Sequence, residues 1–333
     1  MLLWGYILIV CLLLRGAFFY QNLQTPLNIP SSESDRESYL FTVQSGQTFS
    51  QISNYLLSLD ILNSAFDIRV FARLSGKASK IKAGEYELEE GMNALGLLNK
   101  LVAGDVFYQR IRILEGWTLT QALLEIQANP NIETSLDINN IDELQNVFGT
   151  NFYPEGMLFP DTYNFNSGTT DREILERASI LMQQVLSEEW QRRAVGLPFE
   201  SSYEALVLAS IIEKETGQAD ERELIAGVFI NRLQNNMRLQ TDPTVIYGLG
   251  SRFDGDLTRA NLQEMTPYNT YRIDGLPPTP IALAGREAIK AALNPDLNEY
   301  LYFVARGDGS HYFSRTLAEH NAAVERFQLG SEN

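Results

Sequence analysis

Residues 201–217 read SSYEALVLASIIEKETG, a stretch that predicts an apolar helix with two acids in its last turn. Ser201 and Glu204 have the spacing of a capping box, which marks the start of a helix. Gly217 is a typical residue at a helix end, because glycine accepts the left-handed conformation that closes many helices. The sequence therefore predicts a helix that begins near Ser201 and ends near Gly217.

Glu213, the first of the two acids, follows Leu206 and Ala209 by seven and four residues, so the three lie on one helix face. A carboxyl group there is partly desolvated and faces the negative end of the helix dipole, and both effects raise its pKa. An acid that stays protonated near neutral pH is what cleavage of a glycosidic bond requires. The alternative is a glutamate that extends to solvent at the helix end.

The composition describes an acidic globular protein. The chain has 333 residues, enough for two or three domains, and its 44% hydrophobic share is ordinary for a folded protein. The formal net charge is −16, from 26 basic and 42 acidic residues. This balance argues against nucleic acid or anionic lipid as the main partner, because both need a basic surface.

Cysteine and histidine are scarce, which narrows the possible chemistry. The single cysteine, Cys11, lies in the apolar N-terminal segment, and the two histidines are His311 and His320. Their spacing does not suggest a zinc site, and the chain contains no G-x-S-x-G motif. We therefore expect carboxylate chemistry, with no metal and no cofactor.

The chain is expected to begin with a membrane anchor. Residues 1–20 are nearly all apolar, and about 20 helical residues span a bilayer. No Ala-x-Ala-like cleavage site follows, so we expect a retained anchor. Because no Lys or Arg precedes the span, charge does not set its orientation. Residues 21–39 are expected to form a polar linker.

A small α/β module is predicted over residues 40–106. FTVQSGQTFSQI at 41–52 reads as strand, turn and helix start, and IRILEGWTLTQA at 111–122 repeats that order. Thr48 and Thr118 are placed to cap the helices that follow. The V-x-x-G-x-T pattern resembles LysM-type glycan-binding domains, and the alternative is a generic small domain.

The larger region, residues 107–330, contains a loop rich in aromatics, Gly and Pro, YPEGMLFPDTYNF at 153–165. Its acids are Glu155 and Asp161. Aromatic faces and carboxylates suit sugar rings and their hydroxyls, so the loop is a candidate glycan contact. The alternative is a packed surface loop.

Six segments in one order carry a resemblance to a known family. The chain closely resembles the endolytic murein transglycosylases of the MltG (YceG-like) family from its apolar start through residue 328. The segments are EGMLFPDTY at 155–163, LASIIEKETG at 208–217, LQTDPTVIYG at 239–248, TPYNTY at 266–271, GLPPTPI at 275–281 and YLYFVARGDGSHYFSRTLAEHN at 300–321.

The resemblance implies a single-pass protein of the cell inner membrane with its catalytic domain in the periplasm. It implies an α+β fold with an N-terminal transmembrane helix, a LysM-like module and a catalytic Glu near the end of a helix. One glutamate, carried over to Glu213, would cleave the β-1,4 bond between N-acetylmuramic acid and N-acetylglucosamine in nascent peptidoglycan. The products would have 1,6-anhydro ends, and cleavage would terminate strand elongation. Peptidoglycan synthases or divisome proteins are the protein partners to expect.

Other site residues are inferred from the same segments. We expect substrate-binding groups that contact the N-acetyl and hydroxyl groups of the glycan, with a structural loop hydrogen bond as the alternative for each. These are Gln240, Thr241, Asp242, Tyr268, Asn269, Tyr271 and Glu155. Glu215 points about 200° around the helix from Glu213 and is expected to have a structural or supporting role.

Two other functions compete with the lytic transglycosylase. A hydrolytic, muramidase-type glycosidase would use Glu213 as acid and Asp242 or Glu155 as base or nucleophile, and its products would incorporate water. A non-catalytic glycan-binding scaffold of the wall-synthesis machinery would bind glycan without cleaving it.

Overall fold

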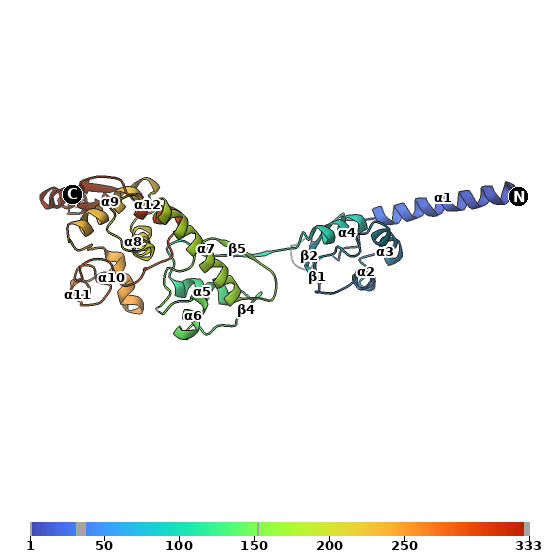
Figure 1. The fold of residues 1–333 in the computed structure, drawn as a ribbon, viewed down its shortest axis with the longest axis horizontal. Coiled ribbons are helices and arrows are strands. Elements are labelled where there is room, and N and C mark those ends of the chain that lie inside the picture. Colours follow the sequence, from blue (N-terminus) through green and yellow to red (C-terminus); the bar gives the residue numbers. More distant parts are fainter. Residues whose placement is uncertain (1, 31–37, 152, 330–333) are drawn as a thin grey trace. The chain divides into compact units, whose positions relative to one another are not determined.

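A computed structural model describes residues 2–30, 38–151 and 153–329, and it divides the chain into two compact units. Unit 1 comprises Met1–Gln109 and Asn164–Ser167, and unit 2 comprises Arg110–Tyr163 and Gly168–Asn333. Both units mix helices with short strands (Figure 1), which confirms the predicted α+β class.

Unit 1 packs helices against a two-stranded antiparallel sheet. The pairing of β1 with β2 runs from Ser38 opposite Glu89 to Val43 opposite Gly84. Tyr86 and Leu88 of β2 are fully buried, so one sheet face forms the core of the unit. The elements are α1 (Leu2–Gln24), β1 (Ser38–Val43), α2 (Phe49–Ser58), α3 (Ala65–Leu74), β2 (Gly84–Glu89) and α4 (Ala94–Ala103).

The order β1, α2, α3, β2 covers most of the predicted module at residues 40–106. The Thr48 side chain accepts a hydrogen bond from the backbone N–H of Gln51, and the Gln51 side-chain oxygen accepts one from the backbone N–H of Thr48. The predicted cap of this helix is therefore confirmed. The LysM-like character of the module stays a prediction.

The chain before β1 differs from the expected linker over residues 21–39. Leu23 and Leu27 are buried in the core of unit 1, and Arg15 of α1 forms an ion pair of 3.0 Å with Asp67 of α3. Residues 21–30 thus fold onto the module, because their two leucines bury apolar surface against it. Residues 31–37 of the expected linker lie outside the described residues.

None of the helices in the described part of the chain combines the length and the apolar character needed to cross a bilayer. The transmembrane anchor at residues 1–20 stays a prediction of the sequence.

Unit 2 is mainly helical. Strands β3 (Gln109–Arg112) and β5 (Thr162–Phe165) lie partly in each unit. The strands wholly within unit 2 are β4 (Ile132–Glu133), β6 (Thr169–Thr170), β7 (Tyr302–Ala305) and β8 (His311–Ser314). Its α-helices are α5 (Leu119–Ala128), α6 (Ile141–Phe148), α7 (Asp171–Gln191), α8 (Ser202–Glu215), α9 (Arg222–Gln234), α10 (Asp242–Leu249), α11 (Arg259–Gln263), α12 (Arg286–Leu293) and α13 (Leu317–Val324). Short 3-10 turns cover Ala219–Glu221 and Gly250–Arg252, and a π-helical turn covers Glu325–Leu329.

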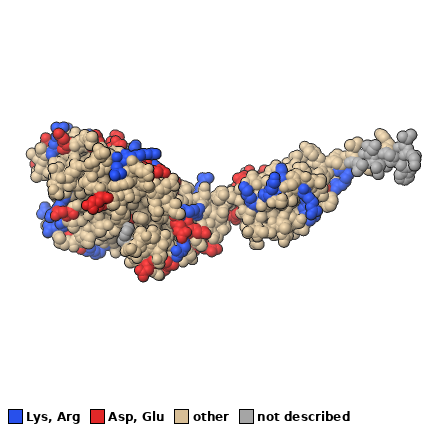
Figure 2. Space-filling model, viewed as in Figure 1, with Lys and Arg blue, Asp and Glu red and all other residues tan. Residues whose placement is uncertain are grey.

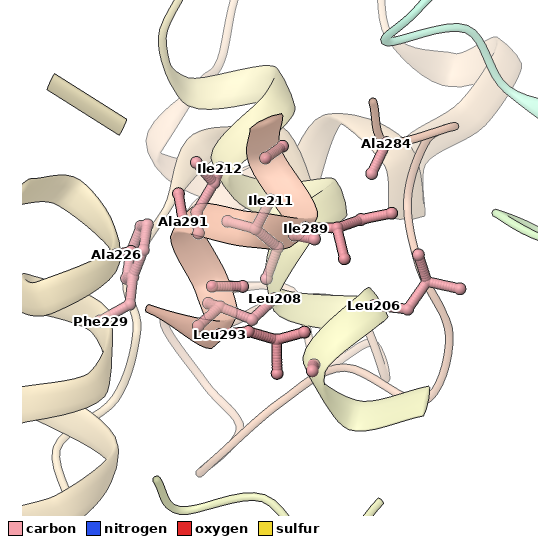
Figure 3. Packing of buried hydrophobic residues seen from close by; sticks show 14 of the residues in the cluster. Leu206, Leu208, Ile211, Ile212, Ala226, Phe229, Ala284, Ile289, Ala291 and Leu293 are labelled. Atoms are coloured by element: carbon pink, nitrogen blue, oxygen red, sulfur yellow. The ribbon is translucent and has the colours of Figure 1, made fainter. Parts of the chain in front are cut away.

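Helix α8 is the predicted apolar helix, and it forms the centre of unit 2. Every residue from Ala205 to Ile212 is buried, so this helix is surrounded on all sides by other elements. Figure 3 shows Leu208 and Ile211 of α8 packed against Ile289 and Leu293 of α12. Such burial contributes about 1.5–3 kcal/mol for each large apolar side chain, which fixes the end of α8 in the domain.

The β7–β8 hairpin lies near that helix end, since Phe303 and His311 line one pocket together with Glu215. Strands β7 and β8 form an antiparallel hairpin in which Ala305 lies opposite His311, and β4 pairs with β6 in parallel.

Figure 2 shows Lys and Arg interspersed with Asp and Glu on the visible face of unit 2. This mixture differs from the continuous basic surface that binds nucleic acid.

Candidate active site

The last turn of α8 directs its two acids into different surroundings. Glu213 and Glu215 are two positions apart, and an α-helix turns by about 200° over two residues. Both side chains are half-buried. The two carboxylates therefore lie on opposite sides of the helix end and take part in separate networks.

Glu213 faces the start of α12. Its Oε2 accepts a hydrogen bond of 3.0 Å from the backbone N–H of Gly285, the residue that caps α12. The side chain of Glu115 covers the same glycine so closely that a Cβ at Gly285 would overlap it. Burial raises the pKa of Glu213, and the negative charge of Glu115 adds to the rise. The predicted direction of the shift is confirmed, and the contact made by this carboxylate stabilises a helix start.

Glu215 lies in a pocket of about 460 Å³, here called the Glu215 pocket. The segment that leads into α10, the loop before α12, the β7–β8 hairpin and α13 all contribute to its wall. The lining residues are Glu215, Arg232, Leu239, Gln240, Thr241, Asp242, Tyr271, Tyr302, Phe303, Val304, Ala305, His311, Leu317, His320, Val324 and Gln328.

Four residues predicted to bind substrate surround Glu215 rather than Glu213. They are Gln240, Thr241, Asp242 and Tyr271. Thr241 Oγ1 donates a hydrogen bond of 2.6 Å to Glu215 Oε2, and Tyr271 donates one of 2.7 Å to Asp242 Oδ1. The structure thus brings these four together at one acid, while their contact with substrate stays a prediction.

The surroundings of Glu215 favour a protonated carboxyl group. Burial is the main cause that raises its pKa, and the charge of Asp242 raises it further. The Thr241 hydrogen bond, His311 and Arg232 act in the opposite direction. A general acid needs a raised pKa so that it holds its proton before the reaction. It also needs neighbours, here Arg232 and His311, that stabilise the carboxylate after the proton is lost.

Backbone strain accompanies the pocket. Gln240 has a φ of 50°, a left-handed conformation that non-glycine residues rarely adopt. Its N–H donates to the carbonyl of Thr270, and the N–H of Thr241 donates to the Thr270 hydroxyl. Strained residues held by such surrounding bonds occur preferentially at functional sites.

A histidine and a glutamate form a second network in the wall of the Glu215 pocket. His311 Nδ1 lies 2.6 Å from Glu221 Oε2, and the backbone N–H of His311 donates to Glu221 Oε1 at 2.8 Å. Both side chains are about nine-tenths buried. Glu221 therefore fixes the orientation of the ring and favours the tautomer with a proton on Nδ1.

The remaining predicted site residues lie elsewhere. Asn269 is fully buried, and its side-chain amide donates to the backbone carbonyls of Asn261, Leu262 and Glu264. These bonds give Asn269 the structural role that was the alternative, and its contact with substrate stays a prediction. Asp161 lines neither the Glu215 pocket nor the one described next.

Glu155 and Tyr268 line a second pocket of about 830 Å³, here called the Glu155 pocket. Glu155 is almost completely buried and accepts hydrogen bonds from the N–H groups of Leu119 and Gly156 and from the hydroxyl of Tyr247. Burial raises the pKa of Glu155 to about 7, although these three bonds lower it. The lining residues are Gly116, Thr118, Thr120, Gln121, Tyr153, Glu155, Lys214, Pro243, Ile246, Tyr247, Gly250, Ser251, Tyr268 and Ile281.

Residues 41–326, which include most of both units, match one family model, the YceG-like family. The chain belongs to the YceG-like family. A curated relative named endolytic murein transglycosylase, from Bacillus subtilis (strain 168), is 35% identical over 97% of this chain and 92% of its own length. A relative of the same name from Streptococcus pneumoniae is 26% identical over 96% of this chain and 64% of its own length.

A solved structure supports the family membership. The crystal structure of a YceG-like protein from Listeria monocytogenes matches with a TM-score of 0.55 and 31% sequence identity. The match covers 86% of this chain and 99% of that one.

In this YceG-like chain the site offers carboxylates, tyrosines and one oriented histidine. Over residues 2–30, 38–151 and 153–329, no group of three or more His, Cys, Asp or Glu side chains is arranged to hold a metal ion. Glu215 lies in its pocket with Arg232 and His311 as neighbours, an arrangement that suits proton transfer by side chains.

Sequence reasoning missed Glu215 and the Glu221–His311 pair as site residues. The 200° separation of the two acids was available, but it did not indicate which side faces a pocket. Glu221 and His311 are 90 residues apart, so no local pattern links them. No local signal in the sequence identifies Glu215, because its pocket is formed by segments that follow later in the chain.

Proposed function

We propose that this YceG-like protein is an endolytic murein transglycosylase that cleaves the glycan strands of peptidoglycan. The family membership and the names of its relatives from two bacteria support this activity. The observation that carries the chemistry is the carboxyl group of Glu215, held by Thr241 in a pocket lined by polar and aromatic side chains.

We assign the general acid to Glu215 rather than to Glu213, the residue that the sequence favoured. Glu215 shares its pocket with Gln240, Asp242 and Tyr271, whereas Glu213 bonds the start of α12. A general acid has to reach the leaving oxygen of a bound substrate, and a pocket provides that access. The difference between these two acids is open to direct test.

The proposed reaction uses one carboxyl group twice. Glu215 donates its proton to the oxygen of the β-1,4 bond, and C1 of the N-acetylmuramic acid residue develops positive charge. The C6 hydroxyl of the same sugar attacks C1 and gives its proton to the Glu215 carboxylate, so the product has a 1,6-anhydro ring and the acid is regenerated. Because Thr241 bonds Oε2, the other oxygen, Oε1, remains to carry the proton.

The surrounding side chains would support these proton transfers. Arg232 and His311 offset the negative charge that Glu215 acquires midway through the reaction. Arg232 is itself held in place, since its Nε and Nη1 donate to the backbone carbonyls of Leu301 and Leu239. A preorganised cation of this kind stabilises developing charge without reorganising.

Product analysis by mass spectrometry tests the proposal. Purified peptidoglycan is treated with the full chain, with Glu215→Gln and with the matched variant Glu213→Gln. We expect 1,6-anhydro ends from the wild type, a loss of about a thousandfold in rate for Glu215→Gln, and retained cleavage for Glu213→Gln.

Each other outcome has a defined meaning. Loss of cleavage in Glu213→Gln with activity in Glu215→Gln would return the catalytic role to Glu213. Hydrated reducing ends would identify a hydrolytic glycosidase instead. Glycan binding without cleavage by the wild type, under conditions where a related transglycosylase is active, would favour the scaffold.

A further inference from the structure

We propose that the Glu155 pocket is a second glycan-binding subsite, which holds neutral sugar rings of the same strand that Glu215 cleaves. This inference rests on the proposed function. It assigns a substrate contact to a separate cavity that the reaction at Glu215 does not use.

The two pockets are neighbours because two short segments separate them. Lys214 lines the Glu155 pocket and the next residue, Glu215, lines the other. Asp242 lines the Glu215 pocket and the next residue, Pro243, lines the Glu155 pocket. Consecutive Cα atoms are 3.8 Å apart, so the pockets open on either side of the end of α8 and the start of α10.

The lining of the Glu155 pocket matches the surface chemistry of a sugar. Three tyrosines, Tyr153, Tyr247 and Tyr268, provide aromatic faces, and the other polar lining groups include Thr120 and Ser251. Sugar rings stack on aromatic faces with their C–H surfaces and exchange hydrogen bonds with hydroxyl and amide groups. The volume of about 830 Å³ lies within the range of about 300–1,000 Å³ that is usual for ligand pockets.

The carboxyl group of Glu155 holds parts of the pocket wall in place before a ligand binds. Glu155 Oε1 accepts from the N–H of Leu119 at the start of α5 at 2.7 Å, and Oε2 accepts from the hydroxyl of Tyr247 on α10 at 3.0 Å. The rings of Tyr247 and Tyr268 meet edge to face with centroids 4.9 Å apart. A preformed aromatic wall loses little entropy when a ligand binds.

The two charged groups of the pocket already have hydrogen-bond partners within the protein, which favours a neutral ring over the charged peptide stems that peptidoglycan also carries. Both oxygens of Glu155 already accept hydrogen bonds, and the side chain is almost completely buried. The amine of Lys214 donates to the carbonyl of Gly116 at 3.2 Å. A peptide stem presents several carboxylates and amines that need partners of opposite charge, whereas an N-acetylglucosamine ring needs none.

The test fills the pocket and measures glycan affinity without cleavage. In the full chain carrying Glu215→Gln, Thr120→Trp places an indole at the pocket wall, and Glu125→Trp on the exposed side of the same helix is the matched control. The probes are peptide-free glycan strands and the same strands with their peptides. Amidase digestion prepares the former, and it leaves a lactyl carboxylate on each N-acetylmuramic acid and a neutral ring at each N-acetylglucosamine. Ser251→Trp fills the pocket from another segment and replaces Thr120→Trp if the latter unfolds.

We expect Thr120→Trp to weaken the affinity for peptide-free strands by about tenfold, the loss of one good contact, and Glu125→Trp to leave it unchanged. Equal affinity of the pocket-filling and control variants for both probes would overturn the inference. A loss confined to peptide-bearing strands would also overturn it, because the pocket would then hold the peptide. The binding measurement tests the pocket and does not depend on cleavage. A failure of the proposed function would be seen in a different experiment, as a wild-type chain that does not cleave peptidoglycan.

Discussion

The hydroxyl of Thr241 donates a hydrogen bond of 2.6 Å to Oε2 of Glu215, which joins the residue before α10 to the last residue of α8. The bond favours the ionised form of Glu215 and thereby moderates the rise in pKa that burial causes. It also selects one orientation of the carboxyl group in the pocket. Thr241 is therefore expected to position the acid rather than to bind substrate alone.

Thr241→Val is expected to reduce kcat by about tenfold, because a hydrogen bond to a charged group contributes about 1.5–3 kcal/mol. Without this donor the pKa of Glu215 rises further, so the alkaline limb of the pH profile moves to higher pH. Both are measured on peptidoglycan with Thr241→Ser as the control, which keeps the donor. An unchanged pH profile in Thr241→Val would contradict the positioning role.

Replacing Glu213 by alanine is expected to reduce stability more than activity. The substitution removes the acceptor for the Gly285 N–H at the start of α12, and the loss of a helix cap costs about 0.5–2 kcal/mol. Glu213→Gln keeps a side-chain oxygen and should lose less. Urea unfolding of both variants measures the difference, and equal stability of wild type and Glu213→Ala would show that the bond contributes nothing.

Glu155 should make folding stability depend on pH. Its pKa is about 7 in the folded protein and 4.5 in its ordinary state, so the folded state binds its proton more tightly. The favourable contribution is complete below pH 4.5 and is lost as the pH rises toward 7 and above, on the order of 3 kcal/mol at most.

Glu155→Gln removes this titration, while its amide can still accept from Leu119 and meet the Tyr247 hydroxyl. The wild type should therefore lose stability relative to the variant between pH 5 and about 8. Urea unfolding of both proteins at each pH gives the comparison. A constant difference across that range would mean that Glu155 does not titrate there.

Glu221→Gln is expected to lower kcat/KM by about tenfold while the products stay the same. The variant replaces the charged partner of His311 Nδ1 by an amide and releases the ring in the wall of the Glu215 pocket. Kinetics and product analysis are compared with His311→Ala, which should lose a similar amount. Full activity in His311→Ala would exclude a role for the pair.

Local features of the fold could be predicted from the sequence. Thr48 and Thr118 cap their helices as predicted, because a capping box depends on residues three apart. The helix from Ser202 to Glu215 also appears where the apolar pattern and Ser201 placed it, and Ser201 accepts from the N–H of Glu204. These signals are complete within a few residues and need no tertiary information.

The choice between two acids of one helix turn could not be predicted. The side of α8 that carries Glu215 becomes a pocket only when Thr241, Tyr271 and the β7–β8 hairpin fold against it. Those segments follow 26 or more residues later in the chain, so the local sequence around Glu215 does not predict that they contact it. The burial of Leu23 and Leu27 is a similar case. The polar composition of residues 21–39 predicts a linker, and only the folded structure shows that these two leucines lie in the core of unit 1.

The adjacency of the two pockets has a consequence for inhibitor design. Lys214–Glu215 and Asp242–Pro243 each contribute one residue to either cavity, so fragments that occupy the two sites lie close together. A short covalent tether between such fragments makes the second binding event intramolecular and raises its effective concentration. One bivalent molecule could thus bind far more tightly than either fragment alone.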